Sequence, residues 1–140
     1  MNKVSILCLG LLFSALASSE EKWDFALPIL MACQSGPVSA LDIRLCIDAE
    51  YEKSDKELNR VYKKLIESLV NPSDLVHAEI EWIKFRNYSC AFETSAFETS
   101  SQAQQTLYAS CLLHHTKIRI NDLKRLTEMT CNGCPERKNP

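Results

Sequence analysis

Residues 39–70 read SALDIRLCIDAEYEKSDKELNRVYKKLIESLV, and this stretch decides the fold. A Gly36-Pro37 pair precedes it and an Asn71-Pro72 pair follows it, as is typical of helix boundaries. Side chains of one stripe recur along it at alternating steps of four and three: Tyr51, Asp55, Leu58, Tyr62, Leu65 and Leu69. This spacing predicts one long helix that packs along a partner helix.

Two more helices are predicted after this stretch. The second has Ser73 as its N-cap and Asp74 in its first turn, where an acidic side chain favours the helix dipole, and it reaches about Cys90. The third begins near Gln102 and ends before the tail that starts at Cys131. The expected inner face of the second helix is formed by Val76, Ile80 and Ile83, widened by Trp82 and Phe85.

The predicted fold class is all-α. Beyond the first 17 residues the chain has only Gly36 and Gly133 as glycines, and no stretch alternates β-branched and polar residues as a strand would. We therefore expect a small antiparallel bundle of about three main helices, stapled by disulfides. Residues 18–38 are expected to form an extended or short-helical lead-in.

The N-terminus is typical of a cleavable secretory signal. Lys3 provides a positive charge, and residues 4–16 form an apolar run that is too short to span a bilayer. Small residues at the cleavage positions indicate cleavage after Ala17, with Ser19 as second choice. We expect residues 1–17 to be removed and the mature protein to be periplasmic or secreted, with no membrane association after cleavage.

The remaining residues 18–140 are predicted to form a single domain. Loss of Lys3 changes the formal net charge from −2 to −3. A mildly acidic domain is a poor partner for nucleic acid or an anionic membrane, and it is compatible with a basic protein partner.

The mature domain retains six cysteines: Cys33, Cys46, Cys90, Cys111, Cys131 and Cys134. An even number in an exported chain predicts three disulfides, although six cysteines allow 15 pairings. The Cys131-x-x-Cys134 spacing also occurs in redox motifs. Here no strand precedes it and no helix follows it to lower a thiol pKa, so a structural staple is favoured over a thiol oxidoreductase.

Asp55 is the polar residue that needs explanation, because a carboxylate on an apolar stripe is costly to bury unless it is paired. We predict that it binds Arg86 or Arg119 as a structural clasp rather than serving as a catalytic acid. His114 and His115 are adjacent on a helix and point about a third of a turn apart, which argues against a shared metal ion. No catalytic or cofactor motif was found, so we expect no enzyme, cofactor or metal site.

Several motifs together resemble the LprI-type lysozyme inhibitor family, a group of exported bacterial proteins. They are CIDAEY at 46–51, SDKELN at 54–59 with Tyr62, WIKFRN at 82–87 with Cys90, and Cys111 with Thr116, Arg119 and Leu123. The resemblance covers roughly residues 33–126 and implies a helical, disulfide-bonded periplasmic or secreted domain, some of whose relatives inhibit lysozyme. It also implies an aspartate at position 55, arginines at 86 and 119, and the pairs Cys33–Cys46, Cys90–Cys111 and Cys131–Cys134.

The segment between the second and third helices is the candidate binding site for a protein partner. It repeats Phe-Glu-Thr-Ser at 92–95 and 97–100, where the resembling family usually has glycines. A loop tied at its base by a disulfide binds at a lower entropy cost. We therefore select Phe92, Glu93, Phe97 and Glu98 as partner-binding residues.

The leading hypothesis is an inhibitor of lysozyme-type cell-wall hydrolases. The first alternative is a periplasmic immunity protein that neutralises an antibacterial effector, with a toxin as its partner. Others are a thiol oxidoreductase that uses the C-terminal cysteines and a purely structural envelope protein.

Overall fold

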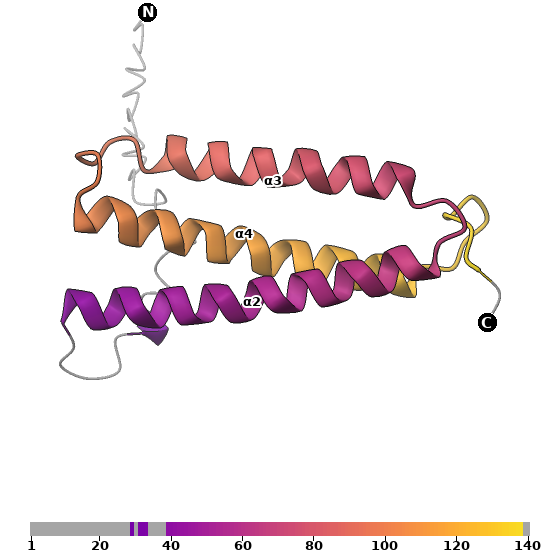
Figure 1. The fold of residues 1–140 in the computed structure, drawn as a ribbon, viewed down its shortest axis with the longest axis horizontal. Coiled ribbons are helices and arrows are strands. Elements are labelled where there is room, and N and C mark those ends of the chain that lie inside the picture. Colours follow the sequence, from indigo (N-terminus) through magenta and orange to yellow (C-terminus); the bar gives the residue numbers. More distant parts are fainter. Residues whose placement is uncertain (1–28, 30, 34–38, 139–140) are drawn as a thin grey trace, which may run out of the picture.

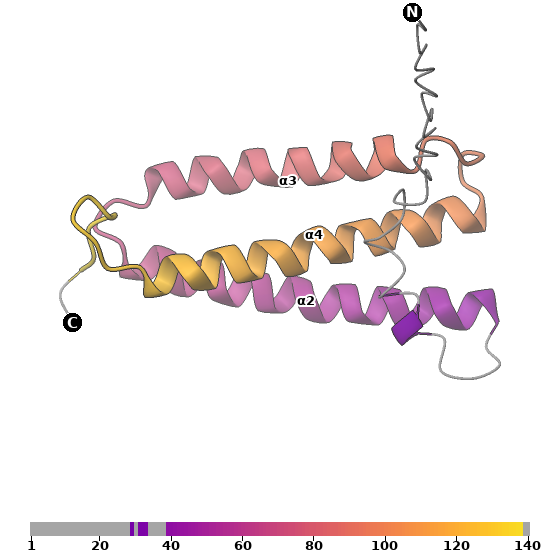
Figure 2. The same cartoon turned by 180° about the vertical axis from the view of Figure 1, so that it is seen from behind.

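The computed structural model describes residues 29, 31–33 and 39–138. The predicted signal segment with its cleavage site, and most of the lead-in, lie outside the described residues. Three long helices dominate the described part: α2 (Ala40–Ser68), α3 (Ser73–Glu93) and α4 (Gln102–Glu128). They run antiparallel in sequence order, and α4 is drawn between α3 and α2 in both views (Figures 1 and 2). The predicted all-α class is confirmed.

Helix α2 begins where its cap predicts. Ser39 Oγ accepts a hydrogen bond from the Asp42 amide at 3.2 Å, and the Asp42 carboxylate accepts one from the Ser39 amide at 2.9 Å, which completes a capping box. These hydrogen bonds hold the pKa of the Asp42 carboxyl below its usual value. The helix ends at Ser68, slightly before the predicted residue 70, because Leu69 pairs with Arg137 of the C-terminal tail in an isolated antiparallel bridge.

The core lies mainly between α2 and α4. One cluster joins Leu58, Val61, Leu65 and Leu69 to Ile120 and Leu123. A second cluster, toward the start of α2, joins Cys33 and Ile47 to Ala109 and Leu113. Burying each of these aliphatic side chains contributes roughly 1.5–3 kcal/mol. The predicted stripe is confirmed where it is apolar, since its leucines are buried and Tyr51 and Tyr62 are half-buried.

Helix α3 packs with a polar face. Its predicted inner face is wrong for Ile80, Ile83 and Phe85, whereas Val76 and Trp82 are half-buried. Its buried residues are Glu79, Arg86 and Cys90, whereas Ile80 and Ile83 are 47% and 42% exposed. The disulfide requires Cys90 to face α4, and Glu79 and Arg86 also bond to α4. Ile80 and Ile83 are exposed because they border the groove between α2 and α3. The N-cap is Pro72 rather than Ser73, and the amide of Ser73 donates to Asn71 Oδ1 at 3.1 Å.

The three disulfides have the pairing that the resemblance implied. Cys33 is joined to Cys46, Cys90 to Cys111 and Cys131 to Cys134, with Cα atoms 5.9, 5.6 and 5.2 Å apart. The first links the lead-in to α2, the second links α3 to α4, and the third lies in the tail. Among the described residues, no helix combines the length and the apolar character needed to cross a membrane.

Candidate functional site

The ionic clasp between α3 and α4 is formed by Glu79 and Arg119. Arg119 donates from Nε and Nη2 to the same oxygen of Glu79, Oε2, at 2.8 and 2.7 Å. The two side chains are only 15% and 8% exposed, so the pair is largely removed from water. The Arg119 guanidinium also lies 5.6 Å from the centre of the Trp82 ring, which gives it a cation–π contact.

The prediction that Asp55 binds Arg86 or Arg119 is therefore wrong. Within the part of the chain that the structure describes, no hydrogen bond or ion pair joins Asp55 to either predicted arginine. Its Oδ2 instead accepts a hydrogen bond from Asn59 Nδ2 at 3.0 Å, one turn along the same helix. The side chain is only half-buried, so its carboxylate does not require a cation as a fully buried one would.

Arg86 occupies the middle of the bundle, as its predicted inward position requires. It is 7% exposed, and its Nη1 donates to Thr116 Oγ1 at 3.1 Å across the α3–α4 interface. Its guanidinium lies 5.0 Å from the Trp82 ring centre and 5.9 Å from that of Tyr51. Aromatic faces and a hydroxyl thus surround this cation and connect all three helices.

A groove of about 180 Å³ lies between α2 and α3 beside these contacts. Its lining residues are Asp55, Leu58, Asn59, Tyr62, Glu79, Ile80, Trp82, Ile83 and Arg86. Burial, together with the nearby Glu79 charge, raises the pKa of the Tyr62 hydroxyl. The tyrosine therefore stays neutral and can donate a hydrogen bond at neutral pH.

The four predicted partner-binding residues differ in their position and in their exposure to solvent. Helix α3 extends to Glu93, so Phe92 and Glu93 lie in its last turn rather than in a loop. Phe92 is 79% exposed and Glu98 is exposed, whereas Glu93 and Phe97 are half-buried.

Residues 94–101 form a short connection anchored at its start. Thr94 is fully buried, and its Oγ1 donates to the Cys90 carbonyl at 2.8 Å. Gln104 Nε2 donates in turn to Thr94 Oγ1 at 3.4 Å, which ties the connection to α4. Ser100 adopts a left-handed conformation with φ 66° before Ser101 caps α4. The expected excursion is therefore a compact, fixed turn.

The same end of the bundle carries a shallow apolar cavity of about 370 Å³ between the starts of α2 and α4. Its lining residues are Ala40, Ile43, Gln102, Ala103, Thr106 and Leu107. The end of α3 lies at this end of the molecule as well (Figure 1). Exposed Phe92, exposed Glu98 and the cavity thus share one end of the bundle, which we call the loop end.

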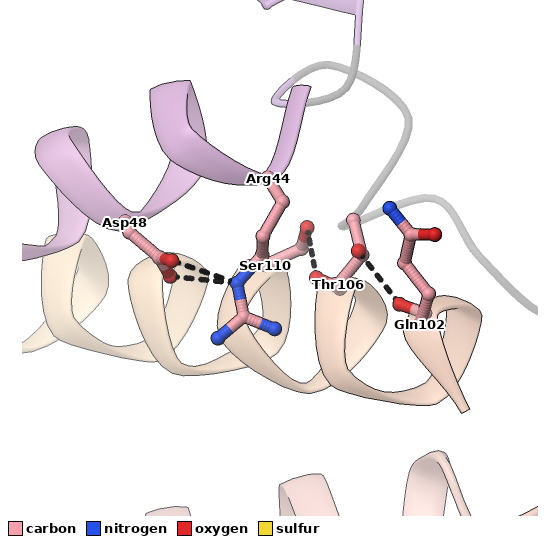
Figure 3. Close-up of polar contacts among 5 residues, drawn as sticks. All are labelled: Arg44, Asp48, Gln102, Thr106 and Ser110. Atoms are coloured by element: carbon pink, nitrogen blue, oxygen red, sulfur yellow. Dashed lines mark hydrogen bonds and ion pairs between the residues drawn. The ribbon is translucent and has the colours of Figure 1, made fainter. Parts of the chain in front are cut away.

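A polar seam between α2 and α4 lies next to the cavity. Arg44 Nε donates to both carboxylate oxygens of Asp48 at 2.9 and 2.8 Å, and Figure 3 shows its guanidinium pointing from α2 toward the side on which α4 is drawn. Its Nη1 atom is buried and has no hydrogen-bond partner among the described residues. The hydroxyls of Thr106 and Ser110 donate to carbonyls one turn back in their own helix. This seam was not singled out from the sequence.

A further cluster surrounds the Cys90–Cys111 disulfide. The two sulfurs and a ring nitrogen of His115 all lie within 4.8 Å of one another. Glu93 adds its carboxylate, with Oε1 3.8 Å from His115 Nε2 and Oε2 3.6 Å from Cys111 Sγ. The Phe85 ring meets His115 edge-on at 6.0 Å. Sequence reasoning weighed the adjacent histidines and Cys111 beside His114, but it did not single out the one-turn spacing of Cys111 and His115.

The outer side of α3 is rich in exposed apolar residues. They are Phe85, Tyr88 and Phe92, with exposed fractions of 59%, 76% and 79%. Phe85 also meets the His115 ring of α4, whereas Ile80 and Ile83 border the groove between α2 and α3. This outer row continues into the loop end at Phe92.

Comparisons with known proteins give a family match and a similar protein. A protein of Rhizobium meliloti (strain 1021), described as uncharacterized, is 29% identical over 112 residues, which are 68% of this chain and 78% of that protein. No solved structure matches the chain. Residues 31–123 match the family described as lysozyme inhibitor LprI, and this match spans α2, α3 and most of α4. The chain therefore belongs to the LprI lysozyme inhibitor family.

Proposed function

We propose that this protein is a periplasmic or secreted inhibitor that binds lysozyme-type cell-wall hydrolases and has no catalytic activity of its own. The observation that carries the proposal is the match of residues 31–123 to the lysozyme inhibitor family. The predicted signal segment and the three disulfides support an oxidising compartment outside the cytoplasm. No observation favours the immunity-protein or oxidoreductase alternatives.

We place the binding surface at the loop end of the bundle. Phe92 offers a large exposed aromatic side chain, and such side chains often carry much of the energy of a protein interface. Glu98, in the connection between α3 and α4, adds an exposed negative charge. The shallow apolar cavity can accept a side chain of the partner. Because Thr94 and the Cys90–Cys111 disulfide fix the connection, little conformational entropy is lost on binding.

The chemistry of the target supports this choice. Most glycoside hydrolases use two carboxylic side chains on either side of the scissile bond, within a cleft that accommodates the sugar chain. A rigid helical end with a protruding aromatic ring can block such a cleft without entering it deeply. With residues 1–17 removed, the formal net charge is −3, which would favour encounter with a basic hydrolase.

The test is a lysis assay with purified oxidised protein, muramidases of several classes and isolated peptidoglycan. We expect micromolar protein to slow lysis by at least one of them. The Phe92→Ala/Glu98→Ala variant should inhibit at least ten-fold more weakly, with an unchanged melting temperature. The matched control is Val70→Ala/Glu67→Ala, which removes an exposed apolar and an exposed acidic residue at the opposite end.

Two outcomes would contradict the proposal at different levels. Failure of correctly folded protein to slow any of the muramidases would remove the inhibitor function. Full inhibition by the Phe92→Ala/Glu98→Ala variant would preserve the function and move the binding surface elsewhere, with the outer row of α3 as the next surface to test.

A further inference from the structure

We propose that Cys90, Glu93, Cys111 and His115 form a binding site for a thiophilic divalent cation such as Zn²⁺ when the Cys90–Cys111 disulfide is reduced. This inference is independent of lysozyme inhibition. It concerns the junction that fastens α3 to α4, and its basis is the placement of four ligand-bearing side chains on two neighbouring helices.

Each helix contributes two of the four side chains. Cys90 and Glu93 are three residues apart on α3, and Cys111 and His115 are four residues apart on α4. These are the two spacings that place helical side chains next to each other on one face. The disulfide shows that the two faces oppose each other directly, with Cα atoms 5.6 Å apart.

The distances fit a tetrahedral ion. Zinc bonds of about 2.3 Å to sulfur and about 2.0–2.2 Å to nitrogen or oxygen require ligand atoms roughly 3.3–3.8 Å apart. Glu93 lies near this range through its two oxygens, with Oε2 3.6 Å from Cys111 Sγ and Oε1 3.8 Å from His115 Nε2, so a small rotation of its carboxylate would bring one oxygen to the ion. The sulfurs are bonded to each other in the oxidised protein, and reduction frees them to separate by side-chain rotation.

The ligand set favours zinc over harder cations. Two thiolates, an imidazole and a carboxylate make four ligands of the types that zinc prefers, whereas magnesium and calcium prefer oxygen alone. Both cysteines are fully buried, and the Phe85 ring packs edge-on against His115. A cation held there would be shielded from water and would require no large movement of either helix.

The reaction balances with a dithiol as the reductant. The dithiol gives two electrons and two protons to the disulfide, becomes a disulfide itself and leaves two protein thiols. Binding of the cation then converts both thiols to thiolates and releases two protons to solvent. Exchange with the oxidised, disulfide form of the reagent reverses the process: the reagent takes up two electrons and two protons, the Cys90–Cys111 disulfide re-forms and the ion leaves. The disulfide and the metal would thus be alternative links between the same two helices.

The experiment uses a Cys131→Ser/Cys134→Ser background, so that the exposed tail cannot bind metal. The protein is reduced with a phosphine under anaerobic conditions and titrated with Co²⁺, whose thiolate complexes absorb in the visible range, and then with Zn²⁺. We expect one equivalent of Co²⁺ with tetrahedral thiolate absorption, displaced by Zn²⁺. The oxidised protein should bind none.

The variants separate this site from other cysteines. His115→Ala and Glu93→Gln should each weaken Co²⁺ binding at least ten-fold, and His114→Ala should leave it unchanged. Binding that survives Cys90→Ser/Cys111→Ser would assign the ion to Cys33 and Cys46 and overturn the proposal. If the reduced protein loses helicity, recovery of its helical circular dichroism on addition of Zn²⁺ supports the site, and lack of recovery contradicts it.

Discussion

Helix α4 has two neighbours, and it is joined to each by different chemistry. Toward α2 it presents Leu113, Ile120 and Leu123, which pack against aliphatic side chains. Toward α3 the most buried contacts are the Glu79–Arg119 ion pair, the Arg86 contacts and a disulfide, beside the half-buried Leu75 and Trp82. Apolar packing depends on volume and tolerates small rotations, whereas ion pairs and disulfides fix a single rotation of the helix. The α2–α4 core therefore provides most of the stability, and the α3–α4 junction provides the specific orientation.

The largest effect is expected in the α2–α4 core. Leu123 is fully buried, and Leu123→Ala should lower the free energy of unfolding by about 3–5 kcal/mol, because it removes contacts and leaves a cavity. Urea unfolding of the oxidised protein measures this change. Leu41→Ala, at a position that is 58% exposed, is the control and should change stability by less than about 0.5 kcal/mol. A loss below about 1 kcal/mol for Leu123→Ala would place the main core elsewhere.

A smaller loss is expected at the α3–α4 junction. Glu79→Ala leaves Arg119 without its carboxylate in a largely buried site and should cost about 2–3 kcal/mol, since the partly exposed guanidinium can still reach water. Asp55→Ala is the matched control and should change stability by less than about 0.5 kcal/mol. A double-mutant cycle with Arg119→Ala isolates the coupling. Equal losses for both acidic residues would contradict the assignment of the clasp.

The contrast between the two junctions also explains which features of the fold could be predicted from the sequence. The helix boundaries followed from proline, glycine and capping residues, and the α2 face followed from a single clear stripe. Helix α3 carries apolar residues on several sides, including Ile80, Trp82 and Phe85, so its periodicity does not single out one face. The useful signal was Cys90, because pairing with Cys111 determines which side of α3 must face inward.

The candidate site was predictable in part for the same reason. Arg86 lies one turn before Cys90 and was correctly expected to point inward, but the acid was sought on α2 rather than on α3. The binding residues were assumed to lie in a loop, whereas α3 continues to Glu93 and turns that side chain toward the disulfide. Of the four predicted partner-binding residues, Phe92 and Glu98 are exposed, as contact with a partner requires.

Helix capping gives a third, smaller test of the comparison. Ser39 caps α2 through its side chain, whereas Ser73 is the first helical residue of α3 and its amide donates to the Asn71 side chain. Ser39→Ala should therefore cost about 1 kcal/mol in thermal or urea unfolding. Ser73→Ala should cost much less, and a loss as large as that of Ser39→Ala would restore Ser73 as the functional cap.

The smallest effect is expected when the pH is lowered, and it concerns an ion pair at the surface of the α2–α4 core. Glu57 joins the two helices by contacting Lys124 Nζ at 2.9 Å, and it also pairs with Arg60 at 2.7 Å. Hydrogen bonds from Arg60 and Lys124 lower the pKa of the Glu57 carboxyl to about 2. Because the folded pKa lies below the unfolded value of 4.5, this contribution is complete above pH 4.5 and is lost as the pH falls toward 2.

Glu57→Gln should accordingly flatten the decline in melting temperature between pH 4.5 and 2, and the difference from the parent protein should shrink at high salt because the pair is exposed. Glu52→Gln, an exposed carboxylate on the same helix, serves as the control and should leave the decline unchanged. A parallel decline in all three proteins would show that the Glu57–Lys124 contact adds nothing to the α2–α4 core. That core would then be held by its apolar contacts alone.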